Sequence, residues 1–133
     1  MFPSMRLRNL CAIAALLAGN ALAHHSFNAE FDLNKPVKFT GKVTEMKWSN
    51  PHSWIYVDVE TGGKVVNWAL ETGGANALIR RGWKKGDLPA GTMVVVDGWQ
   101  ARNGTPTANV SSITFPDGHK LFAGSSNEAA PTK

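Results

Sequence analysis

The chain has 133 residues, of which 43% are hydrophobic, and a formal net charge of +4 at pH 7. This length fits one domain with a modest core. The charges are interspersed and form no basic block, which argues against a nucleic-acid partner. The single cysteine excludes an intramolecular disulfide and a thiolate metal cluster.

The first 23 residues have the three parts of a secretory signal. Arg6 and Arg8 form a positive start, residues 10–18 are a short apolar run, and residues 21–23 (Ala-Leu-Ala) are a small-residue cleavage site. The run is too short for a membrane-spanning helix, which needs about 20 apolar residues. Cys11 lies at the start of this run and not after it, so a lipoprotein anchor is not expected. The pattern is typical of bacterial export and predicts a periplasmic protein without a membrane anchor.

Cleavage after Ala23 would leave a chain of 110 residues that begins with His24 and has no cysteine. Two of the 14 basic residues leave with the signal, so 12 basic residues face 10 acidic ones and the net charge becomes +2. We expect an N-terminal segment over 24–36 that packs on a barrel domain over 37–123. The small, polar residues 124–133 predict a disordered tail.

Three strands are expected in the first part of the domain. Alternation of apolar and polar residues predicts strands over 37–49 and 52–60. Gly41 inside the first strand indicates a bulge or a sharp bend. Adjacent glycines at 62–63 predict a hairpin turn into a third strand over 64–71.

The pattern then changes to helical spacing, which predicts one short helix over 75–81 that stops at Gly82. A Pro-Gly turn leads to a strand over 92–100, and a turn at Asn103-Gly104 leads to a fifth strand over 108–115. A further turn precedes a short segment over 119–123.

Three strands, a helix and two strands follow one another in the order of an oligonucleotide/oligosaccharide-binding (OB) barrel, a five-stranded Greek-key barrel. The expected fold is therefore all-β with one short helix, arranged as a small OB-like barrel, and a small β-sandwich is the alternative. Trp68 is assigned to the core. Four further tryptophans could lie in the core, at the barrel rim or against a ligand: Trp48, Trp54, Trp83 and Trp99.

Two short motifs stand out, residues 24–27 (His-His-Ser-Phe) and residues 50–52 (Asn-Pro-His). They accompany the segments GKVTEMKWSNPHSWIYVDV, NWALE, LIRRGW, VVVDGW and DGHKLFAGSS. Together these segments resemble a family of small exported bacterial proteins catalogued as a domain of unknown function. The resemblance covers nearly the whole mature chain and implies a periplasmic, single-domain protein. It brings no established activity, cofactor or catalytic residue.

Cleavage after Ala23 would give His24 a free α-amine beside its own imidazole. With a second imidazole from His25 or His52, these groups form a three-nitrogen site that resembles the histidine brace of copper proteins. Nitrogen ligands in a tetragonal arrangement suit Cu(II), and an amine with a pKa of about 8 yields its proton to a metal at neutral pH. These histidines therefore predict a site for copper or another divalent metal.

Each candidate metal ligand also has an ordinary structural interpretation. The two N-terminal histidines could simply be solvated. His52 follows Pro51, which stiffens the chain, so it could shape a turn and hydrogen-bond the backbone. Glu30 and Asp32 could orient a metal-bound imidazole or pair with surface charges. His119 lies in a turn and is assigned to the surface without a role.

A face of aromatic and polar side chains is the second candidate site. His52, Trp54 and Tyr56 share one face of the second strand, and Asn67 and Glu71 belong to the third. OB barrels bind ligands around these strands, and aromatic rings beside polar groups suit a sugar or another flat ligand. In the alternative, the N-terminal segment folds back and covers this face with its two phenylalanines. That arrangement would bring the N-terminal histidines close to His52.

Three functions follow from these patterns. The first is a non-enzymatic periplasmic protein that holds copper or a related divalent ion. The second is an OB-type module that binds a sugar, a peptide or a protein partner through its aromatic face. The third is an oxidative enzyme with a brace copper. A binding role is favoured, because the chain is small and has no nucleophile elbow, phosphate loop, HExxH or CxxC motif.

Overall fold

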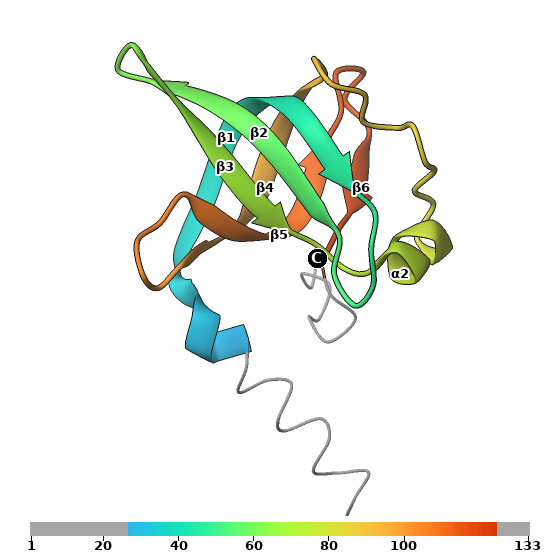
Figure 1. The fold of residues 1–133 in the computed structure, drawn as a ribbon, viewed down its shortest axis with the longest axis horizontal. Coiled ribbons are helices and arrows are strands. Elements are labelled where there is room, and N and C mark those ends of the chain that lie inside the picture. The colour runs from blue at the N-terminus through green and yellow to red at the C-terminus, as the bar shows by residue number, and fades with distance from the viewer. Residues whose placement is uncertain (1–26, 125–133) are drawn as a thin grey trace, which may run out of the picture.

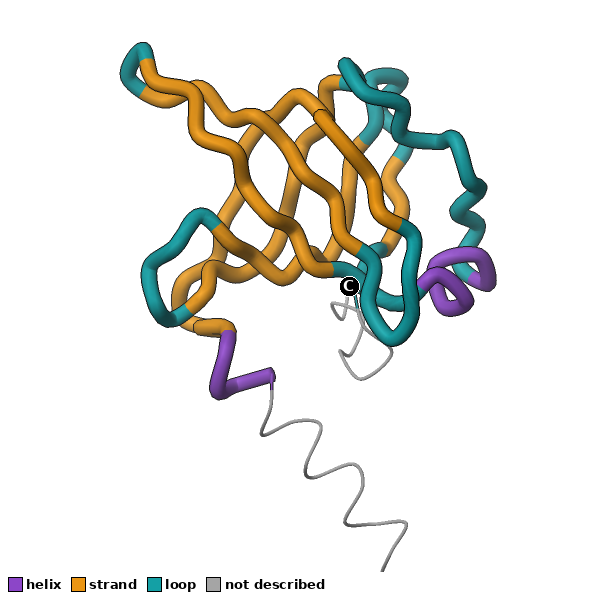
Figure 2. Tube along the Cα trace, viewed as in Figure 1, coloured by secondary structure: helices purple, strands orange, loops and turns teal. Residues whose placement is uncertain are grey.

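Six strands and one short helix make up the part of the chain, residues 27–124, that the computed structural model describes (Figures 1 and 2). The strands are β1 (Phe31–Lys47), β2 (Trp54–Thr61), β3 (Lys64–Glu71), β4 (Met93–Ala101), β5 (Thr107–Thr114) and β6 (Lys120–Phe122). The helix α2 (Ala75–Arg80) lies between β3 and β4, and one helical turn at residues 27–30 precedes β1.

The strands form one sheet in the order β3-β2-β1-β4-β5-β6. Neighbours in this order pair antiparallel, and a further parallel pairing joins β3 to β5. This pairing connects residues 69–71 with residues 107–109 and closes the sheet into an uneven, barrel-like ring (Figure 2). The prediction of an all-β fold arranged as an OB-like barrel is therefore confirmed. Residues 27–124 form six strands in place of the expected five, and the helical turn at residues 27–30 adds to the one helix that was expected.

The long strand β1 pairs with a different neighbouring strand along each part of its length. Its residues 36–42 pair with β4, and its residues 42–47 pair with β2. β1 starts at Phe31, six residues before the start of the predicted strand. A register shift between Phe31 and Pro36 explains the difference, because a bulge breaks the alternation on which the prediction depended.

The second half of β1 bends close to β2. A Cβ atom added to Gly41 would lie 3.1 Å from Cβ of Val57, so glycine permits this approach. The predicted irregularity in this strand is present slightly further along, as a register shift between Val43 and Glu45.

The core lies inside the ring. Alternate residues of β2 are buried at Ile55, Val57 and Val59, and residues of every strand from β1 to β5 join them. Trp68, which was assigned to the core, is partly buried and packs on Phe39 with ring centroids 4.8 Å apart. These apolar side chains thus pack against one another inside the ring and form a single core.

The helix α2 closes one region of the core. Leu78 is fully buried and packs in the core cluster, as does Trp83 just beyond the helix. The indole Nε1 of Trp83 donates a hydrogen bond to the Phe122 carbonyl at 2.9 Å, which ties the segment after α2 to β6. No helix within residues 27–124 is long and apolar enough to cross a membrane.

Candidate functional site

The loop between β1 and β2, residues 48–53, is fastened to the residues that follow β3. The Ser53 amide donates to the Gly73 carbonyl at 3.1 Å, and the Thr72 amide donates to the Ser53 carbonyl at 3.0 Å. The Ala75 amide at the start of α2 donates to the Ser49 carbonyl at 2.9 Å. A Cβ on Gly74 would lie 2.6 Å from the Pro51 carbonyl oxygen, so glycine is required where these backbones meet.

His52 projects from this loop toward the end of β3. Its Nδ1 lies 3.1 Å from the Thr72 carbonyl oxygen and 3.4 Å from Oε1 of Glu71. A carbonyl oxygen only accepts hydrogen bonds, so Nδ1 must carry the proton in this contact. The lone pair of the neutral ring is then on Nε2, and the side chain is 41% exposed.

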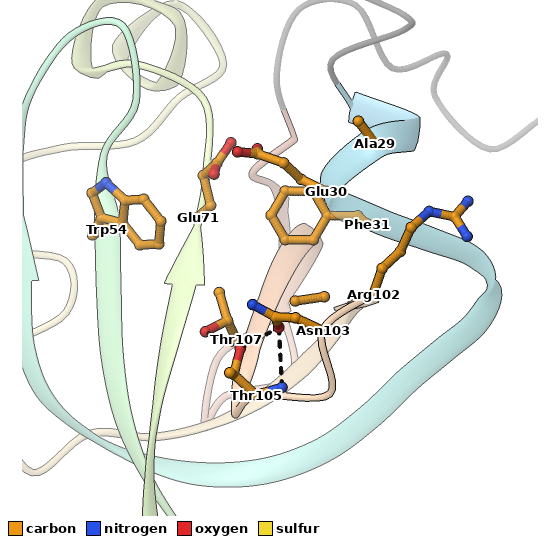
Figure 3. A pocket seen from close by; sticks show the side chains of 10 residues that line it. Ala29, Glu30, Phe31, Trp54, Glu71, Arg102, Asn103, Thr105 and Thr107 are labelled. Carbon is orange, nitrogen blue, oxygen red and sulfur yellow. Dashed lines mark hydrogen bonds between the residues drawn. The ribbon is translucent and has the colours of Figure 1, made fainter.

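A pocket of about 510 Å³ lies where β2 begins and β3 ends (Figure 3). Trp54 and Glu71 form one side, and they are directly opposite each other in the β2–β3 ladder. The N-terminal segment forms another side with residues 29–31. The loop between β4 and β5, residues 102–106, completes it together with Ala101 and Thr107.

The N-terminal segment is therefore a wall of this pocket. Phe31 is buried and packs against Phe27, and Phe27 makes an edge contact with Trp99 at 6.1 Å between centroids. The Arg102 amide donates to the Glu30 carbonyl at 2.8 Å. These contacts place the segment beside Trp54 and Glu71 without filling the space between them.

Arg102 strengthens this attachment through its side chain. Its Nη1 lies 3.8 Å from Oδ1 of Asp32, and its Nε donates to the Asn28 carbonyl. Asp32 also accepts a hydrogen bond from the Asn34 amide at 3.0 Å. Asp32 is thus paired with Arg102 and largely buried, and a role in orienting a metal-bound imidazole stays a prediction.

Glu71 and Glu30 both line the pocket, and their carboxylates point toward each other (Figure 3). The Glu71 side chain is only 12% exposed. Burial raises the pKa of Glu71 above its ordinary value of 4.5, and the negative charge of Glu30 raises it further. Positive charge on His52 and the amide of Asn109 act in the opposite direction but do not cancel the effect.

Asn109 is a residue of this region that the sequence patterns did not single out. It is opposite Glu71 in the β3–β5 pairing and is fully buried. Its side-chain atoms Oδ1 and Nδ2 are removed from solvent. Its side-chain amide hydrogen-bonds the Glu71 carboxyl, which lowers the pKa of that acid. The one available signal was a polar residue between apolar neighbours in a strand.

The four predicted ligand-binding residues divide into two pairs. Trp54 and Glu71 line the pocket. Tyr56 and Asn67 share the same face but lie further along the strands, outside the pocket. The Asn67 amide donates to Asp58 at 2.9 Å, and the ring of Tyr56 lies 5.1 Å from Nζ of Lys47. The pocket thus covers less of the sheet than the face that was predicted from the alternation of side chains. It also includes the β4–β5 loop, which that alternation does not predict.

The predicted metal site is only partly within the structure. His24 and His25 precede residue 27 and lie outside the described residues. Across residues 27–124, no group of three or more histidine, cysteine or carboxylate side chains is placed to hold a metal ion. His119 stacks on Phe115 and contacts Asp117, at a distance along the chain from the pocket.

A search among curated proteins found no significant match for this chain. A family model, that of DUF6152, described as a family of unknown function, matches residues 12–110. The match spans most of the chain, including the strands β1 to β4 and the Asn-Pro-His loop. It confirms the resemblance to a family of unknown function, and the chain belongs to DUF6152.

Proposed function

We propose that this protein binds a small organic ligand in the pocket between Trp54, Glu71 and the β4–β5 loop. The pocket itself is the observation that carries the proposal. Its volume of about 510 Å³ falls within the range of about 300–1,000 Å³ that small-molecule sites occupy. Its place, around β2, β3 and the β4–β5 loop, is where OB barrels bind their ligands. The signal predicted at residues 1–23 supports a periplasmic location for this role.

The lining suits a ligand with one flat or apolar part and one polar part. Trp54 and Phe31 supply aromatic surface, while Glu71, Thr105 and Thr107 supply polar groups. The Thr105 hydroxyl already bonds Oδ1 of Asn103 at 2.7 Å and lies 3.2 Å from the Thr107 hydroxyl. Six of the ten lining residues are polar or charged, so several side chains could orient the polar part of the ligand.

A ligand screen on protein matured by export tests this proposal. Binding of each compound in a small-molecule library would be followed by changes in the NMR spectrum. For compounds that bind, we expect Trp54→Ala to weaken binding about tenfold, the upper end of what an aromatic pair contributes. Tyr56→Ala is the matched control, because Tyr56 lies on the same face two residues away and outside the pocket.

Compounds that bind Tyr56→Ala as they bind the unmodified protein, but lose affinity for Trp54→Ala, would support the proposal. A library that yields no ligand, or ligands that are indifferent to Trp54, would overturn it. Equal losses in both variants would indicate the wider aromatic face in place of the pocket.

Binding of copper or another divalent metal through His24, His25 and His52 is a second candidate function. One observation favours it: His52 donates from Nδ1 to the Thr72 carbonyl, with Glu71 beside it. Metal-binding histidines usually make such a contact with the nitrogen that does not bind the metal. Nε2 of His52 thus has the arrangement of a metal ligand. Glu30 faces Glu71, which lies 3.4 Å from Nδ1 of His52.

A titration with Cu(II) tests the metal function. Export-matured protein, which begins at His24 if the signal is cut after Ala23, would be compared with the same protein carrying one extra N-terminal residue and with His52→Ala. Tight binding that both changes weaken would establish the amine and His52 as ligands. Equal binding in all three proteins, or no tight binding in any, would exclude this site.

A further inference from the structure

We infer that the ligand of this pocket is an organic cation, with an ammonium group carried on an apolar or aromatic body. The inference rests on the proposed function, because it names the chemical class that the pocket would accept. It is drawn from the charge and the aromatic surface of the residues that line the pocket.

Two carboxylates of the pocket lining, those of Glu30 and Glu71, point toward each other (Figure 3). Glu30 is exposed, and the Glu71 side chain is largely buried. Arg102 is a cationic residue of the lining, but its guanidinium points away from both carboxylates and contacts Asp32 and the Asn28 carbonyl. Among the described residues, His52 is the one basic group near Glu71, at 3.4 Å. A bound cation would relieve the repulsion between the two acids.

The remaining surface favours an organic cation over a bare metal ion. Trp54 lies opposite Glu71 in the ladder and presents an indole ring to the pocket. Aromatic faces attract ammonium groups, and indole does so most strongly. A volume of about 510 Å³ is also far larger than an ion requires. The pocket therefore has the elements of an ammonium site with space for the body that carries the charge.

Three compounds of nearly the same shape separate charge from shape: 2-phenylethylamine, 2-phenylethanol and phenylacetate. Their binding to export-matured protein would be measured by calorimetry and by NMR near neutral pH. We expect the amine to bind at least about tenfold more tightly than the alcohol, since a charged hydrogen bond contributes more than a neutral one. Phenylacetate should bind more weakly than the alcohol, because its charge repeats that of the two carboxylates.

Variants that each remove one charge test which carboxylates bind the amine. Glu71→Gln and Glu30→Gln should each weaken binding of the amine about tenfold and leave binding of the alcohol unchanged. Glu60→Gln is the matched control, because it removes the same charge from an exposed position near the far end of β2. An amine that binds Glu60→Gln like the unmodified protein, but loses affinity for the other two variants, would support the inference.

The other outcomes decide between the inference and the proposed function. Equal binding of all three compounds, dependent on Trp54, would show a ligand pocket that does not select cations and would overturn the inference alone. Absence of binding by all three, while other library compounds bind through Trp54, would do the same. If no compound of any class binds through Trp54, both the inference and the proposed function fail.

Discussion

At the scale of single residues, Glu71 is in contact with groups from several elements, and these groups affect its pKa. It ends β3, forms a cross-strand pair with Trp54, and lies opposite the buried Asn109 on β5. Its carboxyl is largely removed from water, with His52 on one side and Glu30 on the other. The desolvation outweighs the contribution of His52, so the pKa of Glu71 is raised. An ionised Glu71 is thus an unfavourable feature of the folded protein.

The raised pKa of Glu71 predicts a pH-dependent effect of Glu71→Gln on stability. The folded state binds this proton more tightly than the unfolded state, so the contribution of Glu71 to stability is present at acid pH and is lost as the pH rises through its folded pKa. We expect Glu71→Gln to have a higher Tm than the unmodified protein at pH 8, and a similar Tm at pH 4.5.

Thermal unfolding followed by circular dichroism would measure both values. Glu60→Gln, with an exposed side chain, should show no such pH-dependent gain. A Glu71→Gln protein that is less stable at pH 8, or equally changed at both pH values, would contradict the assignment of an unfavourable buried charge.

At the scale of elements, the helix α2 depends on its packing. It has six residues and no side-chain hydrogen bond at its N-cap. An isolated helix of this length is unstable in water, so tertiary contacts must hold it. Leu78 is fully buried in the core cluster, whereas its neighbour Ile79 is 51% exposed. The two adjacent residues therefore contribute very differently to the attachment of the helix.

The contrast between these neighbours gives a matched pair of variants. Leu78→Ala should lower the free energy of unfolding by about 2–5 kcal/mol, because it leaves a cavity in a packed core. Ile79→Ala should change it by no more than about 0.5 kcal/mol, as is usual for exposed positions. Urea unfolding of the mature protein would measure both, and similar losses in the two variants would show that the helix is packed through another face.

At the scale of the whole molecule, the ring closes because strands approach each other more closely than ordinary side chains permit. A Cβ on Gly98 would lie 2.1 Å from the Asn109 carbonyl oxygen, next to a register shift in the β4–β5 pairing. A Cβ on Gly41 would lie 3.1 Å from the Val57 side chain. The obstacle at Gly98 is backbone, which cannot yield locally, while the obstacle at Gly41 includes a side chain that can shift.

The two glycines therefore predict a graded response. Gly98→Ala should lower the free energy of unfolding by about 3 kcal/mol, the upper end of overpacking effects. Gly41→Ala should lower it by about 1 kcal/mol or less, because small movements relieve the contact and alanine reduces the entropy of the unfolded chain. Urea unfolding would compare the variants, and a larger loss at Gly41 would contradict this account of how the ring closes.

Much of the fold was accessible to sequence patterns because the patterns are local. Period-two alternation located β2 and β3, adjacent glycines located the turn between them, and helical spacing located α2. The same alternation placed Trp54 and Glu71 on one face, since side chains two residues apart in a strand point to the same side. These properties depend on a few consecutive residues, and neighbours in space do not alter them.

Only the tertiary structure decided which of these residues form a pocket. The register shifts in β1 and β4, the closing pairs between β3 and β5, and the contact of the N-terminal segment with Arg102 join residues far apart in the chain. No local period encodes such contacts, because they depend on how strands bend and meet. They bring Glu30 and Arg102 into the pocket lining with Trp54 and Glu71, and they place the buried Asn109 next to Glu71.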